Sequence, residues 1–184
     1  MSPIEQLAQR AAPLLRHPYI LRIRRNHGLE HATIHILSRH GHRLSGRSDS
    51  DGFYLLGDVP SEQVESAVNE ALERMAAGES ELAVHPNCGT NLVTASFLAT
   101  LVGFAGFAGQ SRRQAWRRFN TAMTVMSLVL MIAPALGGEL QRHVTTAGDT
   151  GGLQLKAVKR HSWQLPFNLG RLVLHRVATQ QAQA

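Results

Sequence analysis

The first half of the chain alternates between helical and strand-like hydrophobic patterns. Apolar residues recur at helical spacing over residues 18–41 and again over residues 61–77, so each segment predicts an amphipathic helix. Between them, the turn sequence DSDG at residues 49–52 predicts a β-hairpin. A short strand is expected at residues 81–84. The order helix, hairpin, helix, strand indicates a small α+β unit.

Two later segments, residues 92–109 and 121–138, contain no charged side chain. An α-helix of this length extends roughly 27 Å, which is close to the minimum that crosses the hydrocarbon core of a bilayer. Four arginines lie in the connection between the segments, so the pattern predicts a transmembrane or re-entrant helical hairpin with a basic tip. The alternative is a buried helical pair in a soluble core, because several Thr residues make both segments less apolar than many membrane spans.

The two ends of the chain are more polar. Residues 1–17 are expected to form a short amphipathic helix or a loose arm. Residues 142–146 and 153–158 alternate around a glycine-rich turn, which predicts a second hairpin. Residues 163–177 combine aromatic and leucine side chains with arginines, and this composition is typical of an interfacial helix.

The charge of the chain is unevenly spread. The formal net charge is +6, yet residues 48–91 hold nine acids against a single arginine. Arginine clusters at residues 22–25 and 112–118 adjoin hydrophobic sequence, and Trp116 lies within the second cluster. Because Trp favours the membrane interface and arginines attract anionic headgroups, we expect membrane lipids as partners. Solvated basic faces on a soluble protein are the alternative interpretation.

Several other classes of partner and processing are disfavoured by the sequence. A single Cys excludes an intramolecular disulfide, and no cleavable signal peptide is visible in the first 25 residues. No recognised nucleic-acid motif is present, so no nucleic acid is expected. Three glycines of the first apolar segment would permit close packing against a second copy or another membrane protein: Gly103, Gly106 and Gly109.

The sequence HGLEH at residues 27–31 matches the inverted zinc-protease pattern H-x-x-E-H. His27 and His31 are one helical turn apart, so both imidazoles can reach one cation. Glu30 projects beside them, where a carboxylate can take a proton from a water whose pKa a metal has lowered. His35 extends the stripe as a spare ligand, a partner of a ligand, or a buried imidazole.

A second candidate element is the sequence HPNCG at residues 85–89, which has the form of a zinc knuckle with His in place of its first Cys. Pro86 restricts the turn, and Gly89 permits the backbone approach that lets amide N–H groups bond a thiolate. An ordinary turn with a buried Cys is the alternative. Together with the helix, the element offers nitrogen and sulfur ligands that suit zinc, from His27, His31, His85 and Cys88.

These two motifs, followed by a hydrophobic segment, resemble a group of bacterial membrane proteins, the YqhQ-like family of predicted metal-dependent enzymes, and a shorter related family of unknown function. The resemblance covers roughly residues 20–110. It implies attachment to a membrane, the inner membrane of a bacterium, and a metal site with Glu30 as an adjacent acid and His27, His31, His85 and Cys88 as ligands. It supplies no substrate. This chain differs from the longer members in Ala32, where a basic residue is expected, and in having fewer hydrophobic segments.

The sequence therefore predicts a membrane-associated zinc protein of the α+β class. The leading hypothesis is a zinc-dependent hydrolase or peptidase in which Glu30 activates water. The alternative is a membrane scaffold or adaptor with a structural zinc, because four protein ligands would close a tetrahedral site. We expect an N-terminal arm, an α+β metal-binding domain, a transmembrane or re-entrant hairpin, and a basic C-terminal hairpin with an interfacial helix, at residues 1–17, 18–91, 92–138 and 139–184.

Overall fold

The computed structural model describes residues 1–164, 166 and 170–182. The chain divides into two compact units, and each is described by itself. The first unit comprises Met1–His85 and Gln141–Ala184, so both ends of the chain contribute to it. The second unit, Pro86–Leu140, is inserted between them in the sequence.

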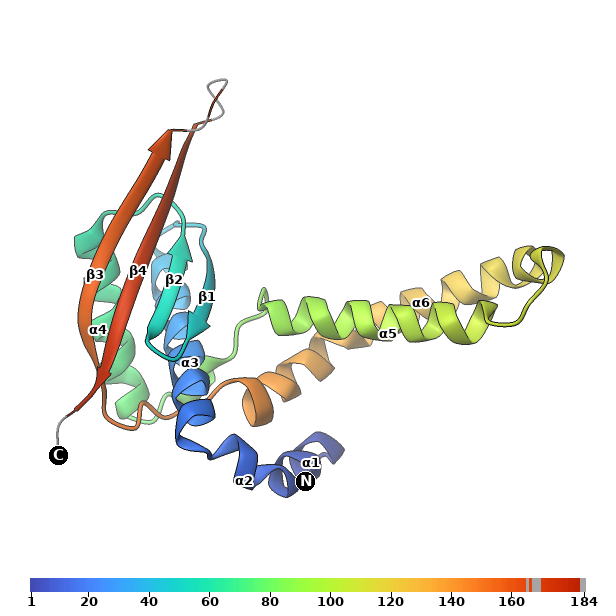
Figure 1. The fold of residues 1–184 in the computed structure, drawn as a ribbon, viewed down its shortest axis with the longest axis horizontal. Coiled ribbons are helices and arrows are strands. Elements are labelled where there is room, and N and C mark those ends of the chain that lie inside the picture. The colour runs from blue at the N-terminus through green and yellow to red at the C-terminus, as the bar shows by residue number, and fades with distance from the viewer. Residues whose placement is uncertain (165, 167–169, 183–184) are drawn as a thin grey trace. The chain divides into compact units, whose positions relative to one another are not determined.

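A four-stranded antiparallel sheet forms one layer of the first unit (Figure 1). Its strands lie in the order β1-β2-β4-β3, and they span Ser45–Asp49 (β1), Gly52–Leu56 (β2), Leu153–Gln164 (β3) and Arg171–Gln181 (β4). The predicted hairpin is confirmed, because Asp49 pairs with Gly52 across the turn that joins β1 to β2. Gly52 has a φ of 139°, a conformation that L side chains rarely adopt.

Helices cover one face of this sheet, and the two predicted amphipathic helices are confirmed as α3 and α4 (Figure 1). Helix α3 begins at Pro18, which the first turn of a helix tolerates because its N–H would have no helical partner. A 3-10 helix η1 follows α4, and a π-helical turn η2 lies near the C-terminal strands. The bounds are Pro3–Arg10 (α1), Ala12–Leu15 (α2), Pro18–Arg39 (α3), Ser61–Ala76 (α4), Ser80–Ala83 (η1) and Gln141–Thr145 (η2).

The hydrophobic core lies between the sheet and the helices α3 and α4. Phe53 and Leu55 on β2 and Val177 on β4 have no exposed surface, and they belong to the same core cluster as Leu29 of α3 and Val68 of α4. Each such side chain contributes roughly 1.5–3 kcal/mol when it leaves water. The hydrophobic stripe of α4 that the sequence predicted therefore orients its glutamates away from the sheet.

The C-terminal segment corrects the sequence prediction. Residues 163–177 were expected to form an interfacial helix, but β3 and β4 pair as antiparallel strands instead. The reason is a period of two in β4, where Val173, His175 and Val177 are buried while the residues between them are more exposed. Residues 165 and 167–169 of the predicted helix lie outside the described residues. The expected basic tail thus supplies half of the sheet.

Two shorter elements also differ from expectation. The strand expected at residues 81–84 is the 3-10 helix η1. The second hairpin is wrong in its first strand, because residues 142–145 belong to η2, whereas residues 153–158 pair with β4. Both errors come from short segments in which hydrogen bonding to distant parts of the chain outweighs local alternation.

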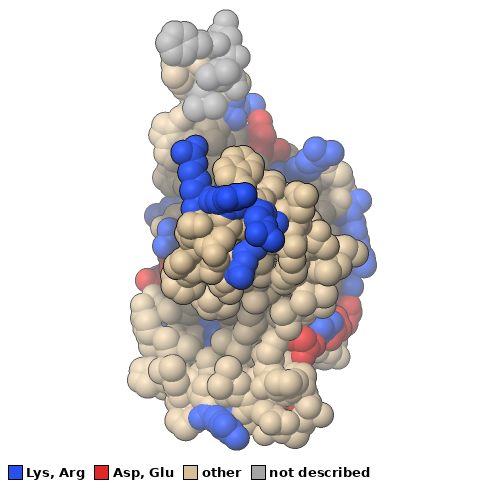
Figure 2. Space-filling model, turned by 90° about the vertical axis from the view of Figure 1, so that its right-hand side faces the viewer, with Lys and Arg blue, Asp and Glu red and all other residues tan. Residues whose placement is uncertain are grey.

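The second unit is a pair of apolar helices, α5 (Gly89–Phe107) and α6 (Arg112–Leu140), that run antiparallel (Figure 1). By length and composition both could cross a membrane, and only 0% and 11% of their most apolar windows are buried. The arginines expected in the connection instead form the first turns of α6. Figure 2 looks onto this end of the unit, where basic side chains gather among uncharged ones.

His175 is a buried titratable group in the sheet of the first unit. Its side chain has no exposed surface. Burial lowers the pKa of His175, and the positive charge of Arg160 on the neighbouring strand lowers it further. The folded domain therefore holds this imidazole in its neutral form.

This burial predicts a loss of stability in mild acid. As the pH falls below about 6.5, the unfolded chain takes up a proton on this imidazole before the folded chain does, so the free energy of unfolding decreases. His175→Leu introduces an apolar side chain of similar size that does not titrate. The free energy of unfolding of this variant should therefore decrease less as the pH falls. Chemical denaturation of both proteins between pH 8 and pH 5 measures it, and parallel stability curves would contradict the assignment.

Candidate metal site

The histidines of α3 form a stripe that meets the segment after η1. The ring centroids of His27 and His31 are 4.4 Å apart. The ring of His85 lies 5.7 Å from that of His31 and 4.7 Å from that of His35. The first unit thus brings together three of the four predicted ligands, His27, His31 and His85, and the additional histidine His35.

Backbone carbonyls hold the first two imidazoles by the same ring nitrogen. Nδ1 of His27 lies 3.0 Å from the carbonyl oxygen of Thr145, and Nδ1 of His31 lies 2.8 Å from that of Ala83. Because a carbonyl oxygen only accepts, Nδ1 must carry the proton in each ring. The lone pair of the neutral imidazole is then on Nε2. Histidines that bind metals are commonly oriented by such a hydrogen bond from their other nitrogen.

His35 is held in the opposite way. Its Nε2 lies 2.8 Å from the carbonyl oxygen of Val84, so Nε2 carries the proton that is donated. This contact fastens the residue that precedes His85 to α3. Burial lowers the pKa of His85, and the charge of His35 lowers it further, so the neutral ring of His85 is favoured. Neutral imidazole is the form that binds metals.

Residues of η2 and the loop after it complete the surroundings of the stripe. The side-chain oxygen of Gln141, which has no exposed surface, accepts the backbone N–H of His85 at 2.8 Å. Arg24 of α3 donates to the carbonyl oxygens of His143 and Thr146 at 3.2 and 2.8 Å. Together with the imidazole contacts, these bonds join α3 to two segments that are distant in the sequence, residues 83–85 and 141–146, and join those two segments to each other.

Sequence reasoning missed these supporting groups. The backbone carbonyls of Ala83 and Thr145 cannot be recognised from the identity of their side chains. These residues are distant from α3 in the sequence and come close to it only in the folded domain. Gln141 was also missed, because a single Gln after an apolar helix resembles any polar helix end.

Glu30 is buried on another side of α3. Its side chain is 3% exposed, and its carboxylate occupies the space that a Cβ at Gly46 of β1 would need. One turn earlier, Asn26 donates to the carbonyl oxygen of Asp49 and accepts from Thr179, so this side of the helix faces the sheet. The structure thus places Glu30 against β1, whereas the imidazoles of His27 and His31 bond to η1 and η2.

Cys88 lies at the start of the second unit as the N-cap of α5. Its Sγ accepts the backbone N–H of Thr90 at 3.4 Å, the kind of amide contact expected of a knuckle. Cys88 is the one cysteine of the chain, so it is the predicted source of a sulfur ligand. His85 is separated from Cys88 by only two residues, so the chain itself limits their Cα separation to about 10 Å.

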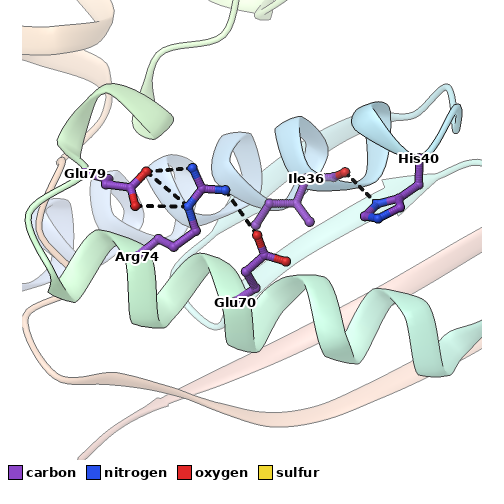
Figure 3. A network of polar contacts seen from close by, with 5 residues as sticks. All are labelled: Ile36, His40, Glu70, Arg74 and Glu79. Carbon is purple, nitrogen blue, oxygen red and sulfur yellow. Dashed lines mark hydrogen bonds and ion pairs between the residues drawn. The ribbon is translucent and has the colours of Figure 1, made fainter.

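Glu70 of α4 lies in a separate network of polar contacts (Figure 3). Its carboxylate pairs with Arg74 at 3.1 Å, and the same guanidinium pairs with Glu79 at 2.6 Å. At 46% exposure, the Glu70 side chain belongs to the solvated face of α4. Figure 3 also shows His40, whose Nδ1 bonds to the carbonyl of Ile36 one turn back.

The fold and these contacts define a class of protein, namely a small α+β domain with a histidine cluster on one helix and two apolar helices inserted in its sequence. The chain belongs to the family described as a domain of unknown function, DUF6391, whose profile matches residues 22–158. This range includes Glu30 and all four predicted ligands. The comparisons support a family of unknown function, and the likeness to the YqhQ-like proteins is not confirmed by them.

One relative is an uncharacterized protein of Picosynechococcus sp., which is 37% identical over 146 residues. The match covers 70% of this chain and 67% of that protein. No solved structure matches the chain.

Gly28 lets α3 approach the loop after η2, and this closeness predicts a cost of substitution. A Cβ at residue 28 would overlap the backbone oxygen of Ala147, so Gly28→Ala should lower the free energy of unfolding by about 1–3 kcal/mol. Gly138→Ala is the matched control, because it also adds a Cβ within a helix but meets nothing within 4 Å. Denaturant unfolding that shows equal losses for both variants would contradict this packing.

Proposed function

We propose that the chain is a membrane-associated protein that binds one transition-metal ion, with zinc as its natural occupant. The observation that carries the proposal is the shared orientation of His27 and His31, whose Nδ1 atoms both bond to backbone carbonyls. Because Nδ1 carries the proton in both rings, Nε2 carries the lone pair that can bind a metal. Two histidines that served only for packing would not both need a hydrogen bond at the same ring position.

The donor set fits zinc by its chemistry. His27 and His31 supply imidazole nitrogens, and His85 and Cys88 supply a further nitrogen and a sulfur from one short segment. Thiolate and imidazole together suit zinc better than magnesium or calcium, which prefer oxygen ligands. The amide hydrogen bond to the Cys88 sulfur also favours the thiolate form that a metal binds.

Metal analysis tests this site directly. Protein purified without chelators should contain about one zinc per chain, as for a single tetrahedral site. A His31→Ala, Cys88→Ala double variant should lose it, while His40→Ala at the C-cap of α3 should retain it. Elemental analysis gives the measurement, and equal zinc in the double variant and the control would refute the site.

A second candidate function is metal-dependent hydrolysis, and the H-x-x-E-H spacing of His27, Glu30 and His31 favours it. Glu30 directly precedes His31 in the sequence, and its side chain is 3% exposed. In a hydrolase its carboxylate would take the proton of the attacking water. In a structural site it would instead serve to hold α3 against β1 beside Gly46.

Glu30→Gln distinguishes the two functions. Because Gln is nearly isosteric and the ligands are untouched, the variant should keep its zinc and its fold. If Glu30 is a general base, hydrolytic turnover should fall by a factor on the order of 10² to 10⁴, and the variant should fail to complement a deletion in the source organism. Full complementation by a folded, zinc-loaded Glu30→Gln protein would exclude the hydrolase and leave the scaffold.

The membrane association that we propose rests on the second unit. Helices α5 and α6 present apolar surfaces along their length, and Phe97, Phe104 and Met131 are more than half exposed. The basic end of the pair, with Trp116 at 70% exposure, suits a lipid headgroup region. Gly103 has no neighbour within 4 Å, so it offers a close-packing position for a second copy or another membrane protein.

Membrane extraction provides the corresponding test. If α5 and α6 insert, the protein should remain in the membrane pellet through washes with high salt and with alkaline carbonate, because apolar burial is insensitive to both. Immunoblotting of pellet and supernatant gives the measurement. Release by salt alone would show that the arginines bind the surface while the helices stay outside the bilayer.

A further inference from the structure

The outer face of the sheet, opposite α3 and α4, carries a row of basic residues. Residues alternate between the two faces of each strand, so the neighbours of buried Phe53, Leu55 and Val177 point away from the core. The strand register then aligns four residues across the whole sheet, and these are Arg47 of β1, Tyr54 of β2, Arg176 of β4 and Lys159 of β3. We call this set the basic row.

Next to the basic row, the same face carries apolar and aromatic residues. Leu56, Leu174 and His161 are aligned by the register, and Trp163 lies opposite Leu172 in the next row. Trp163 is 49% exposed and stacks on His161, with the ring centroids 6.0 Å apart. Exposed apolar side chains that directly adjoin cations form an amphipathic surface. Packing of the buried core does not require such a surface.

A groove of about 500 Å³ beside β1 connects the two kinds of side chain. Arg47 and the hydroxyl groups of β1 line one part of it, while Leu56 and Leu174 line another. A ligand that fits such a lining carries an anionic, hydrogen-bonding end and an apolar end. A phospholipid at the surface of a bilayer has both.

The charges of the first unit are divided between its two sides. The exposed glutamates of α4 lie on the helix side of the domain, whereas the basic row lies on the other side of the sheet. Asp49, an acid that shares the outer face, is paired with Arg176 at 3.0 Å. The outer face therefore complements a negatively charged surface.

We propose that the outer sheet face binds anionic phospholipid headgroups through the basic row, with Tyr54 and Trp163 at the level of the headgroups. Aromatic side chains with polar tips and basic residues are typical of such contacts. Single-stranded nucleic acid is the other polyanion with a matching charge, but it needs open ring faces for base stacking. Here Arg176 lies 4.4 Å over the ring of Tyr54, and His161 covers Trp163.

The proposal uses the membrane association described above but not the metal site. Candidate spans on the same chain would keep the domain within reach of a bilayer, which raises the effective concentration of headgroups. The test below uses micelles, so it does not depend on insertion of α5 and α6, and its outcome is independent of zinc content.

Trp163 supplies the signal for this test. The full chain with Trp116→Phe retains Trp163 as its one tryptophan, and it is placed in dodecyl maltoside micelles mixed with brominated phosphatidylglycerol or brominated phosphatidylcholine. We expect phosphatidylglycerol to shift the Trp163 emission to the blue and to quench it, whereas phosphatidylcholine should do neither. Equal responses to the two lipids would overturn the proposal.

Charge reversal on the face gives the second arm. Arg47→Glu and Lys159→Glu should each weaken the phosphatidylglycerol response by about five- to tenfold, since each cation near an anionic surface contributes measurably to binding. Arg39→Glu, an exposed reversal in the last turn of α3, is the matched control and should change little. Circular dichroism checks that all three variants fold.

A labelled single-stranded oligonucleotide separates the alternative polyanion. Fluorescence anisotropy should show no binding that depends on Arg47 and Lys159. Binding that both reversals abolish, in a protein whose Trp163 ignores phosphatidylglycerol, would assign the face to nucleic acid and overturn the lipid proposal. An equal loss of the lipid response in Arg39→Glu would also overturn it, because net charge and not the basic row would then be responsible.

Discussion

The hydrogen bonds from imidazole nitrogens of α3 to backbone carbonyls are the interactions on which the candidate site depends. His31 bonds to Ala83 at the end of η1, His27 to Thr145 at the end of η2, and His35 to Val84 between η1 and His85. Each carbonyl belongs to a segment that has little regular structure of its own. The helix therefore positions these segments, and they in turn fix which nitrogen of each ring carries its proton.

This dependence explains why α3 is both packed and polar. Gly28 brings the helix close enough to Ala147 for the contacts with η2, and on another side Asn26 and Glu30 face β1. A helix with so many buried polar residues would be unfavourable unless each found a partner. A bound metal would add to the same network, because ligands brought together by folding couple metal affinity to stability.

The sequence predicted the elements whose signals are local. The DSDG turn, the apolar stripe of α4 and the two long apolar helices all follow from side chains within a few residues of one another. The strand β4 was not predicted. Its sequence has His175 at a core position and arginines facing outward, and this amphipathic pattern resembles an interfacial helix. Its pairing with β2 depends on residues more than a hundred positions away.

The candidate site shows the same division. The motif spacing predicted that His27 and His31 share one face of a helix, and the structure places them with rings 4.4 Å apart. The carboxylate of Glu30 lies beside Gly46, on another side of α3 from the imidazoles. This position could not be predicted, because it depends on where β1 crosses the helix. The roles of His35 and Gln141 likewise follow from carbonyl and amide groups that no sequence pattern marks.

X-ray absorption spectroscopy of the zinc-loaded full chain tests the central claim most directly, because it identifies the ligand atoms themselves. The proposed site predicts one sulfur at about 2.3 Å and nitrogen ligands at about 2.0–2.1 Å, with the outer-shell scattering of imidazole rings. Cys88→Ala should remove the sulfur contribution. A first shell composed only of oxygen, or a sulfur signal that persists in Cys88→Ala, would contradict the assignment of the metal to His27, His31, His85 and Cys88.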